Sequence, residues 1–372
     1  MENPCPRPSK RSVDFRPARV RRCQWLLRRD RKNGRRRERL ARRHGATFGS
    51  GILVNEHTRS STYSDGQAIY VVLPERMDFE DNYETTVSHL HNVRLAAKGQ
   101  IKLKLLDFSN LKYISTSAAL VLASEVDRWN HRIKKRIRAK VETWHEDIKR
   151  LLCQMGYFEL LGLKKPDYPP FSKPTVFLPF KRGLVVQGDG GLLIQQLRIE
   201  IEETVGSRIK KLELFGGLSE AITNVSQHAY PKDAAFRQWW LSASYDQSTQ
   251  RLCVTFYDQG LTIPVTLPLS KVAKFIANLL NLNRDSEKIE AAMEVGRSST
   301  GDPERGQGLG DLLQFALAYD GGMLTIYSRR GMYRVNARKN EDEPILRSEK
   351  KDFERSIGGT LIEWSVKIPA ST

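Results

Sequence analysis

The sequence has few cysteines and no long apolar run. Its 372 residues include four cysteines, none of them in a C-x-x-C pair, so neither a structural zinc site nor a disulfide framework is predicted. No apolar stretch approaches the roughly 18 residues that a membrane span requires. The basic N-terminus is not followed by the apolar segment of a secretory signal. We therefore expect a protein of the reducing cytoplasm, with no membrane partner.

Acidic and large apolar side chains are scarce in residues 1–45. This stretch has 17 Lys and Arg against 4 Asp and Glu, and so carries +13 of the chain's net charge of +18. It cannot bury enough apolar surface to fold alone, and residues 1–48 are predicted to be a disordered basic arm. Such an arm can contact nucleic-acid phosphates. A solvated tail or a contact with an acidic protein is the alternative.

The remainder is long enough, at 40% hydrophobic residues overall, for two domains. Strand and helix patterns alternate over residues 60–165, which predicts a sheet covered by helices. The expected strands are residues 68–73, 101–108 and 136–141, and the expected helices are residues 78–97, 118–129 and 145–161. A stretch rich in proline and glycine, residues 166–191, predicts a linker to a second domain at residues 192–372.

A strand, a short loop and an apolar helix follow one another over residues 105–122, LLDFSNLKYISTSAALVL. This order resembles the STAS domain, the fold of anti-sigma-factor antagonists. The resemblance implies a phosphorylated hydroxyl at the helix start, where Thr116 or Ser117 stands. Ser115 replaces the family's aspartate and Ala118 its glycine. The alternative is that Ser115, Thr116 or Ser117 only caps the helix.

Three polar motifs occur in the second predicted domain. Glu220 and Asn224 lie one turn apart on a helix predicted at residues 211–229, where a carboxylate and an amide can polarise water and hold magnesium. A polar helix flank is the alternative. A predicted strand ends in Asp258, and Gly260 follows two residues later. The Asp258 carboxylate could accept a hydrogen bond from a purine amino group, and the absence of a side chain at Gly260 would let the backbone approach the base closely. A loop suited to phosphate precedes the next predicted helix: Arg305, Gly306, Gln307, Gly308, Leu309 and Gly310.

The order of the motifs in this domain resembles that of the GHKL ATPases: E-x-x-x-N, then D-x-G, then G-x-G-x-G. Gly359-Thr360 follows them, at the start of a strand predicted at residues 360–368. Residues 219–231, SEAITNVSQHAYP, most resemble the anti-sigma-factor serine kinase branch. The resemblance implies ATP and Mg²⁺ as cofactors. It makes Glu220 the general base and Asn224 the magnesium ligand.

The same resemblance implies how the nucleotide would be held. Asp258 would accept the adenine amino group, Gly260 would admit the base, and Thr360 would support adenine through water. Thr262 stands where the family's D-x-G-x-G has its second glycine. Residues 267–303 would form a lid over the nucleotide. The phosphates would contact four residues of the glycine-rich loop: Arg305 at the γ-phosphate, with Gly306, Gly308 and Gly310 around the chain.

The sequence thus predicts an α/β fold of two domains, a STAS-like sheet with covering helices followed by a Bergerat-type α/β sandwich. It predicts an ATP-binding regulatory protein, a Mg-ATP-dependent serine/threonine kinase or ATPase switch of the anti-sigma type. The alternative is an ATP-gated interaction module with slow or no turnover. In both cases we expect a protein partner, a second copy of the chain included.

Overall fold

The computed structural model describes residues 62–65, 68–167, 174–185, 190–231, 234, 236–266, 284–298, 308–338, 340 and 344–368. The chain divides into two compact units, residues 1–55 and residues 56–372. The predicted arm lies outside the described residues, all of which belong to the second unit. None of the described helices is both long and apolar enough to cross a membrane.

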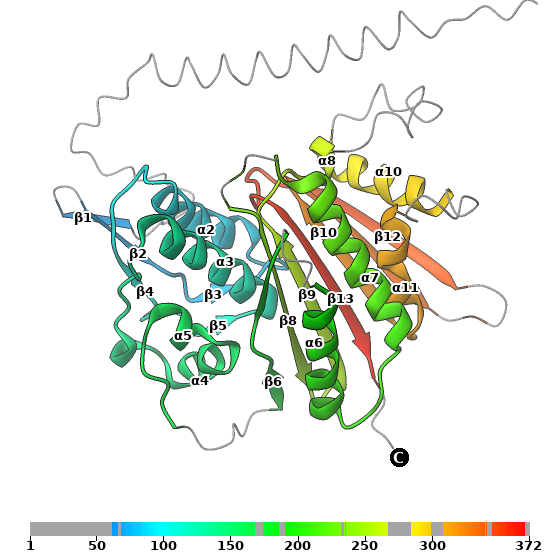
Figure 1. The fold of residues 1–372 in the computed structure, drawn as a ribbon, viewed down its shortest axis with the longest axis horizontal. Helices are drawn as coiled ribbons and strands as arrows, with labels where there is room; N and C mark the ends of the chain where they lie inside the picture. Colours follow the sequence, from blue (N-terminus) through cyan, green and yellow to red (C-terminus); the bar gives the residue numbers. More distant parts are fainter. Residues whose placement is uncertain are drawn as a thin grey trace, which may run out of the picture. The chain divides into compact units, whose positions relative to one another are not determined.

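Residues 62–161 form a small α/β module (Figure 1). Its sheet has the order β1-β2-β4, with β1 antiparallel and β4 parallel to β2, and β3 and β5 form a separate parallel pair. The strands are β1 (Thr62–Asp65), β2 (Ala68–Val72), β3 (Arg76–Met77), β4 (Leu103–Asp107) and β5 (Tyr113–Ile114). The helices are α2 (Tyr83–Ala97), α3 (Thr116–Ile133), the 3-10 turn η1 (Val141–Thr143), α4 (Glu146–Met155) and α5 (Tyr157–Leu161).

Local side-chain and backbone geometry sets the helix ends of the module. Ser115 is the N-cap of α3, because its Oγ accepts a hydrogen bond from Ala118 N at 3.1 Å. The capping interpretation is therefore confirmed for Ser115. The single helix predicted at residues 145–161 is divided into α4 and α5 by Gly156, whose φ of 96° is left-handed.

The strand predicted at residues 136–141 does not form. Residues 136–140 make a hydrogen bond to β4, from Leu106 N to Arg138 O at 3.1 Å, but no strand ladder. Arg136 instead donates to Glu159 O at 2.5 Å, which holds the segment beside α5. The prediction was wrong because alternating basic and apolar residues indicate only an extended segment. A strand also needs a neighbouring strand with which to form hydrogen bonds.

The second part of the unit is built on an eight-stranded antiparallel sheet of order β12-β11-β10-β13-β9-β8-β6, with β7 also paired to β8. The strands are β6 (Thr175–Phe177), β7 (Lys181–Leu184), β8 (Gln238–Asp246), β9 (Arg251–Asp258), β10 (Gly322–Ser328), β11 (Gly331–Arg338), β12 (Ile345–Asp352) and β13 (Thr360–Lys367). The helices are α6 (Gly190–Val205), α7 (Lys211–Asn224), the π-helical turn η2 (Val225–Ala229), α8 (Ile263–Thr266), α10 (Asp285–Ser298), the 3-10 turn η3 (Gly308–Gly310) and α11 (Asp311–Leu317).

The stretch predicted as a linker, residues 166–191, contributes two strands to this sheet. Both β6 and β7 pair antiparallel with β8. Pro174 and Pro179 lie outside the strands, where the missing N–H costs no ladder bond, and Val176 and Phe177 suit a strand. In its described part, the predicted linker is therefore an edge of the sheet.

Alternate residues of the large sheet point into two hydrophobic cores. Ile362 and Trp364 of β13 pack in the core formed with α6, α7, α10 and α11. Leu361 of β13 and Tyr257 of β9 pack in the core formed with α2 and α3. The fold is thus mixed α/β, with a large antiparallel sheet between two sets of helices. We call these the helical face, toward α6 and α7, and the module face, toward α2 and α3.

Candidate functional site

The predicted general base and the predicted magnesium ligand lie together at the end of α7. Asn224 Nδ2 donates to Glu220 Oε1 at 2.8 Å, and both side chains are half-buried. Because this bond uses the amide nitrogen of Asn224, its Oδ1 is the atom suited to ligate a cation. Magnesium usually keeps several waters and takes phosphate oxygens beside one or two protein ligands, so the pair fits that ion.

Among the described residues, no group of three or more His, Cys, Asp or Glu is placed to hold a metal ion.

Asp258 ends β9 on the helical face and is only 4% exposed. Its Oδ1 accepts a hydrogen bond from Gly260 N at 2.8 Å. Burial raises the pKa of Asp258 to about 7, whereas the hydrogen bond from Gly260 and the positive charge of Arg128 act in the opposite direction. The carboxyl group is therefore poised between its neutral and ionised forms near neutral pH.

Two glycines allow close backbone contacts around Asp258. A Cβ on Gly260 would lie 2.4 Å from Ala229 O, and one on Gly359 would lie 1.9 Å from Asp258 O. Leu261 N also donates to Ala229 O at 2.5 Å. The D-x-G turn is thus fixed to η2, the continuation of the helix that carries Glu220 and Asn224, and glycine at 260 is required by that contact.

Thr360 lies directly opposite Asp258 in the register of β9 and β13. Its Oγ1 is 3.0 Å from the Oγ of Ser328, at the end of β10, which also accepts a hydrogen bond from Ile263 N at 2.9 Å. The neighbouring strands β9, β13 and β10 therefore each carry a buried polar side chain on the helical face, at the same edge of the sheet. Ser328 was not predicted from the sequence, although a serine ending an apolar strand was the available signal.

The glycine-rich loop is described only at its end. Arg305 and Gly306 lie outside the described residues, while Gly308–Gly310 forms η3 and leads into α11. A Cβ on Gly217 of α7 would lie 3.5 Å from Asp311 O. The described end of the loop, with Gly308 and Gly310, therefore lies beside the helix that carries Glu220 and Asn224.

The predicted lid, residues 267–303, is also described in part. Residues 285–298 form α10, and Ile289 and Met293 are buried in the core of the helical face. Gly331 of β11 approaches so closely that a Cβ there would lie 2.4 Å from Ser286 N. In its described part, the segment is a packed helix of the helical face, because its apolar stripe meets the sheet.

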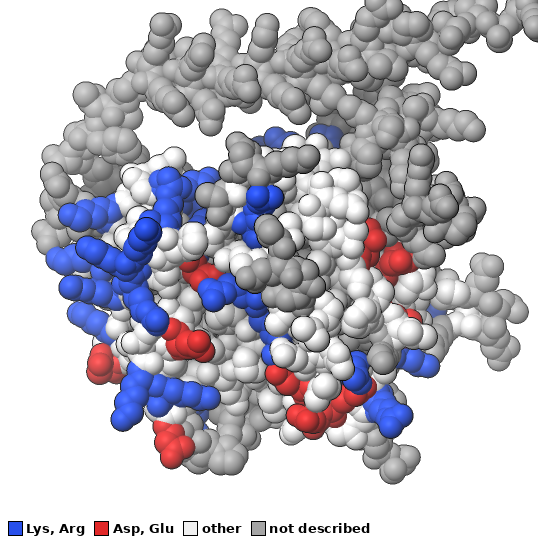
Figure 2. All heavy atoms as spheres, in the orientation of Figure 1, with Lys and Arg blue, Asp and Glu red and all other residues white. Residues whose placement is uncertain are grey.

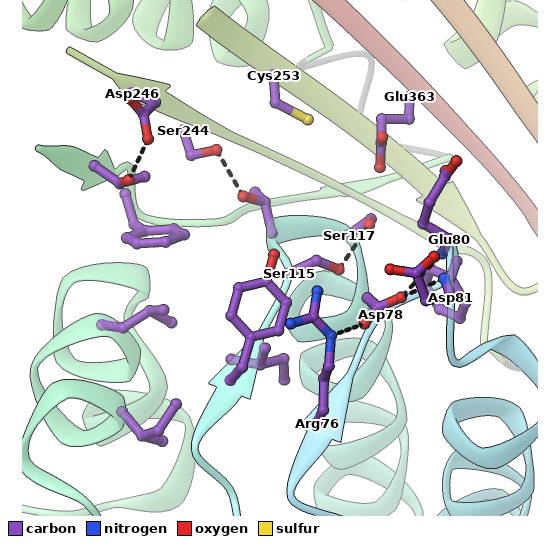
Figure 3. Close-up of a pocket in the computed structure, with 18 of the residues that line it drawn as sticks. Arg76, Asp78, Glu80, Asp81, Ser115, Ser117, Ser244, Asp246, Cys253 and Glu363 are labelled. Atoms are coloured by element: carbon purple, nitrogen blue, oxygen red, sulfur yellow. Dashed lines mark hydrogen bonds and ion pairs between the residues drawn. The ribbon is translucent and has the colours of Figure 1, made fainter. Parts of the chain in front are cut away.

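Thr116 and Ser117 lie on the module face, next to a cavity of about 570 Å³ (Figure 3). Thr116 Oγ1 is hydrogen-bonded to Ser244 Oγ of β8 at 2.6 Å, and Ser117 Oγ lies 3.1 Å from Ser115 Oγ. Both residues are nearly fully buried. The structure thus places the two predicted phosphoacceptors on the face of the sheet opposite to Asp258 and Thr360.

Glu363 of β13 faces the same cavity (Figure 3). Burial raises the pKa of its carboxyl group, and a hydrogen bond from Ser117 partly offsets that rise. The nearby Asp78 is committed to structure, since its Oδ1 accepts hydrogen bonds from the backbone of residues 80–82 and its Oδ2 pairs with Arg76 at 2.7 Å. The cavity is therefore polar, and most of its charges are already paired.

Basic side chains gather over the part of Figure 2 where the module lies in Figure 1. The last turn of α3 and the segment after it contribute several exposed cations: Arg132, Lys134, Lys135, Arg136, Arg138 and Lys140. The positive charge of the chain is thus not confined to residues 1–45.

Comparison with known proteins identifies no family for this chain. No protein-family model matches it, and no curated protein matches it significantly. The features of the chain that bear on its function are its sequence motifs and the geometry around Glu220 and Asp258.

Proposed function

We propose that the chain is an ATP-binding regulatory protein of the cytoplasm, a Mg-ATP-dependent serine/threonine kinase or ATPase switch of the anti-sigma type. In this proposal a STAS-like domain at residues 60–165 is joined to a GHKL domain of the Bergerat fold at residues 192–372. One observation carries it. Three motifs separated in sequence converge on the helical face, where Gly260 contacts η2 and Thr360 lies opposite Asp258.

In this site the adenine amino group donates to Asp258. Thr360 and Ser328, whose hydroxyls lie 3.0 Å apart, supply the polar floor beside it. Asn224 Oδ1 would be a ligand of magnesium, which would screen the charge of the phosphates. The phosphates are proposed to be enclosed by the glycine-rich loop, through Arg305, Gly306, Gly308 and Gly310. For Arg305 and Gly306 this proposal is supported by the family resemblance alone.

Glu220 is proposed to act as the general base. It takes the proton of an attacking hydroxyl as that oxygen bonds to the γ-phosphorus and the bond to the β–γ bridging oxygen breaks, which leaves ADP. Water as the attacker gives phosphate, and a protein hydroxyl gives a phosphoprotein. The placement of Thr116 and Ser117 on the opposite face supports an acceptor on another polypeptide or on a second copy of the chain.

The second candidate is an ATP-gated interaction module with slow or no turnover. The hydrogen bond from Asn224 Nδ2 to Glu220 Oε1 favours it, because a carboxylate that already accepts a strong bond is a weaker base. In that case nucleotide binding would alter association with a protein partner or a second copy.

Nucleic acid is proposed as a further partner of residues 1–45, supported by their charge and by the exposed cations after α3. Deletion of residues 1–45 should remove most salt-sensitive binding to DNA or RNA and leave ATP affinity unchanged. If the full chain shows no such binding, an acidic protein is the better partner.

Incubation with γ-labelled ATP separates the two candidate functions. The full chain and its Glu220→Ala variant would be compared for release of free phosphate and for label on protein. Either product, formed only when Glu220 is present, supports the kinase or ATPase. Tight ATP binding with neither product supports the gated module, and absence of ATP binding would overturn both.

A further inference from the structure

Two helices of the α/β module reach the loops that frame Asp258. The first loop is the D-x-G turn, where Gln259 follows Asp258. The second, residues 353–359, precedes Thr360 on β13. The D-x-G turn also contacts η2 on the helical face through Gly260 and Leu261.

Helix α3 holds the D-x-G turn. Gln259 Nε2 donates to Ser124 Oγ at 2.9 Å in a fully buried contact, and Arg128 Nη2 donates to Gln259 O at 3.4 Å. From the other side of the sheet, Gln259 N donates to Tyr230 OH at 3.0 Å. Gln259 is therefore fixed between the module and the end of η2, and its neighbour Asp258 cannot move independently of α3.

Helix α2 holds the second loop. Arg94 lies in a buried ion pair with Glu125 of α3, Nε to Oε1 at 2.7 Å, and its Nη2 donates to Ile357 O at 2.5 Å. Tyr83 stacks on Phe353 with ring centroids 3.5 Å apart. Gly358 has a φ of 85°, and a Cβ there would overlap the Arg94 guanidinium. The arginine and the left-handed turn therefore require each other.

The ion pair of Arg94 and Glu125 links α2 to α3 beside the second loop. The side chains of Arg94 and Glu125 are 7% and 0% exposed, so the pair cannot rearrange without moving α2 against α3. Gly359 packs directly on Asp258 O, so the two loops also constrain each other.

We infer that Ser124 and Arg94 are positioning residues of the nucleotide pocket, and that α2 and α3 thereby couple the state of the module to ATP affinity. The inference rests on the proposed function for the identity of the ligand. It does not require the module to be phosphorylated, and it assigns Ser124 a role through Gln259 rather than through any contact with nucleotide.

The test compares two serines that each make one buried hydrogen bond between α3 and the sheet. Ser124→Ala removes the partner of Gln259, whereas Ser244→Ala removes the partner of Thr116 at the other end of α3. We expect Ser124→Ala to weaken ATP binding about fivefold, the factor that one ordinary hydrogen bond carries. The Ser244→Ala variant should bind ATP within about twofold of the unmodified chain.

Amide hydrogen exchange of both variants in the absence of nucleotide is the second measurement. Ser124→Ala should speed exchange at residues 259–261, and Ser244→Ala should leave those amides unchanged. Introducing Ser124→Ala into a Gln259→Leu background should have no further effect on exchange or affinity, since Ser124 acts through Gln259.

The outcomes separate the two proposals. If the unmodified chain binds no ATP, the proposed function fails, and exchange alone decides whether α3 positions the turn. If the two alanine variants match each other in exchange and in affinity, Ser124 is only structural and the inference is overturned.

Discussion

The two faces of the large sheet use polar residues differently. Among the described residues, the strand interiors on the helical face are apolar, and the buried polar side chains of that face, Asp258, Ser328 and Thr360, lie at the ends of strands. On the module face, polar side chains stand in mid-strand. Examples are the buried Ser244 and the half-buried Glu363, which contact Thr116 and Ser117 of α3. Polar groups gathered at one end of an apolar face suggest a ligand site, whereas those on the other face mainly attach the module.

The largest effect expected from this comparison is on stability. Trp364 points to the helical face, is fully buried, and donates from Nε1 to Leu312 O at 2.6 Å. Trp364→Ala should lower the free energy of unfolding by about 3–5 kcal/mol. Thr255, equally buried on the module face, has only a weak contact with Cys253 Sγ at 3.8 Å.

The variant Thr255→Val, which keeps the volume of the side chain and removes only its hydroxyl, should cost less than about 1 kcal/mol. Denaturant unfolding of both variants measures the difference. Equal losses would mean that the two faces do not differ in the way described.

The next largest effect is expected from Asp258, whose titration should make the stability of the fold depend on pH. Its pKa is raised by burial to about 7 in the folded chain, so the fold binds this proton more tightly than the unfolded chain does. The stabilisation is complete below the unfolded pKa and is lost as pH rises through about 7, on the order of a few kcal/mol in all. Asp258→Asn should remove this dependence and be the more stable form at pH 8. A Tm that rises with pH from 5 to 8 in the unmodified chain but not in the variant contradicts the assignment.

Glu220 separates binding from chemistry on the helical face. Glu220→Ala should keep Mg-ATP affinity within a few fold and reduce turnover about 100-fold or more, the usual contribution of a general base. Steady-state phosphate release and equilibrium binding measure the two quantities. Unchanged turnover would make Glu220 structural and favour the gated module.

Glu363 gives the smallest effect and sharpens the contrast between the faces. Glu363→Gln keeps the shape of the side chain and removes its carboxyl group, whose pKa is raised by burial. ATP affinity should change less than about twofold, because the cavity lies on the module face. A loss of tenfold in a binding titration would indicate that the cavity, rather than the helical face, holds the nucleotide.

Much of the module and of the helical layer could be predicted from sequence, because their periodicity is local. The helices around Val87, Leu120 and Leu218 and the strand before Asp258 all formed near the expected residues. Strand β8 was missed because all but its last residue are buried and no alternation remains. Strand β12, ILRSEKKD, was missed because an edge strand is mostly exposed and polar.

The candidate site was predictable residue by residue but not as an assembly. The spacing of Glu220 and Asn224 implied their contact, which the structure has at 2.8 Å. Nothing local could show that Gln259 bonds to Ser124, because 135 positions separate the two residues. Nor could it show that Thr116 faces Ser244, since that contact depends on how α3 packs on β8.

The proposed roles of Glu220 and Asn224, and the coupling of the module to ATP affinity, depend on one claim, that the helical face holds ATP through Asp258. Calorimetric titration of Mg-ATP into the full chain and into Asp258→Asn at pH 8 tests it, with the Tm of both proteins measured alongside. We expect saturable binding by the unmodified chain and no detectable binding by a variant that remains folded. Equal affinity in the two proteins would show that Asp258 does not hold the nucleotide.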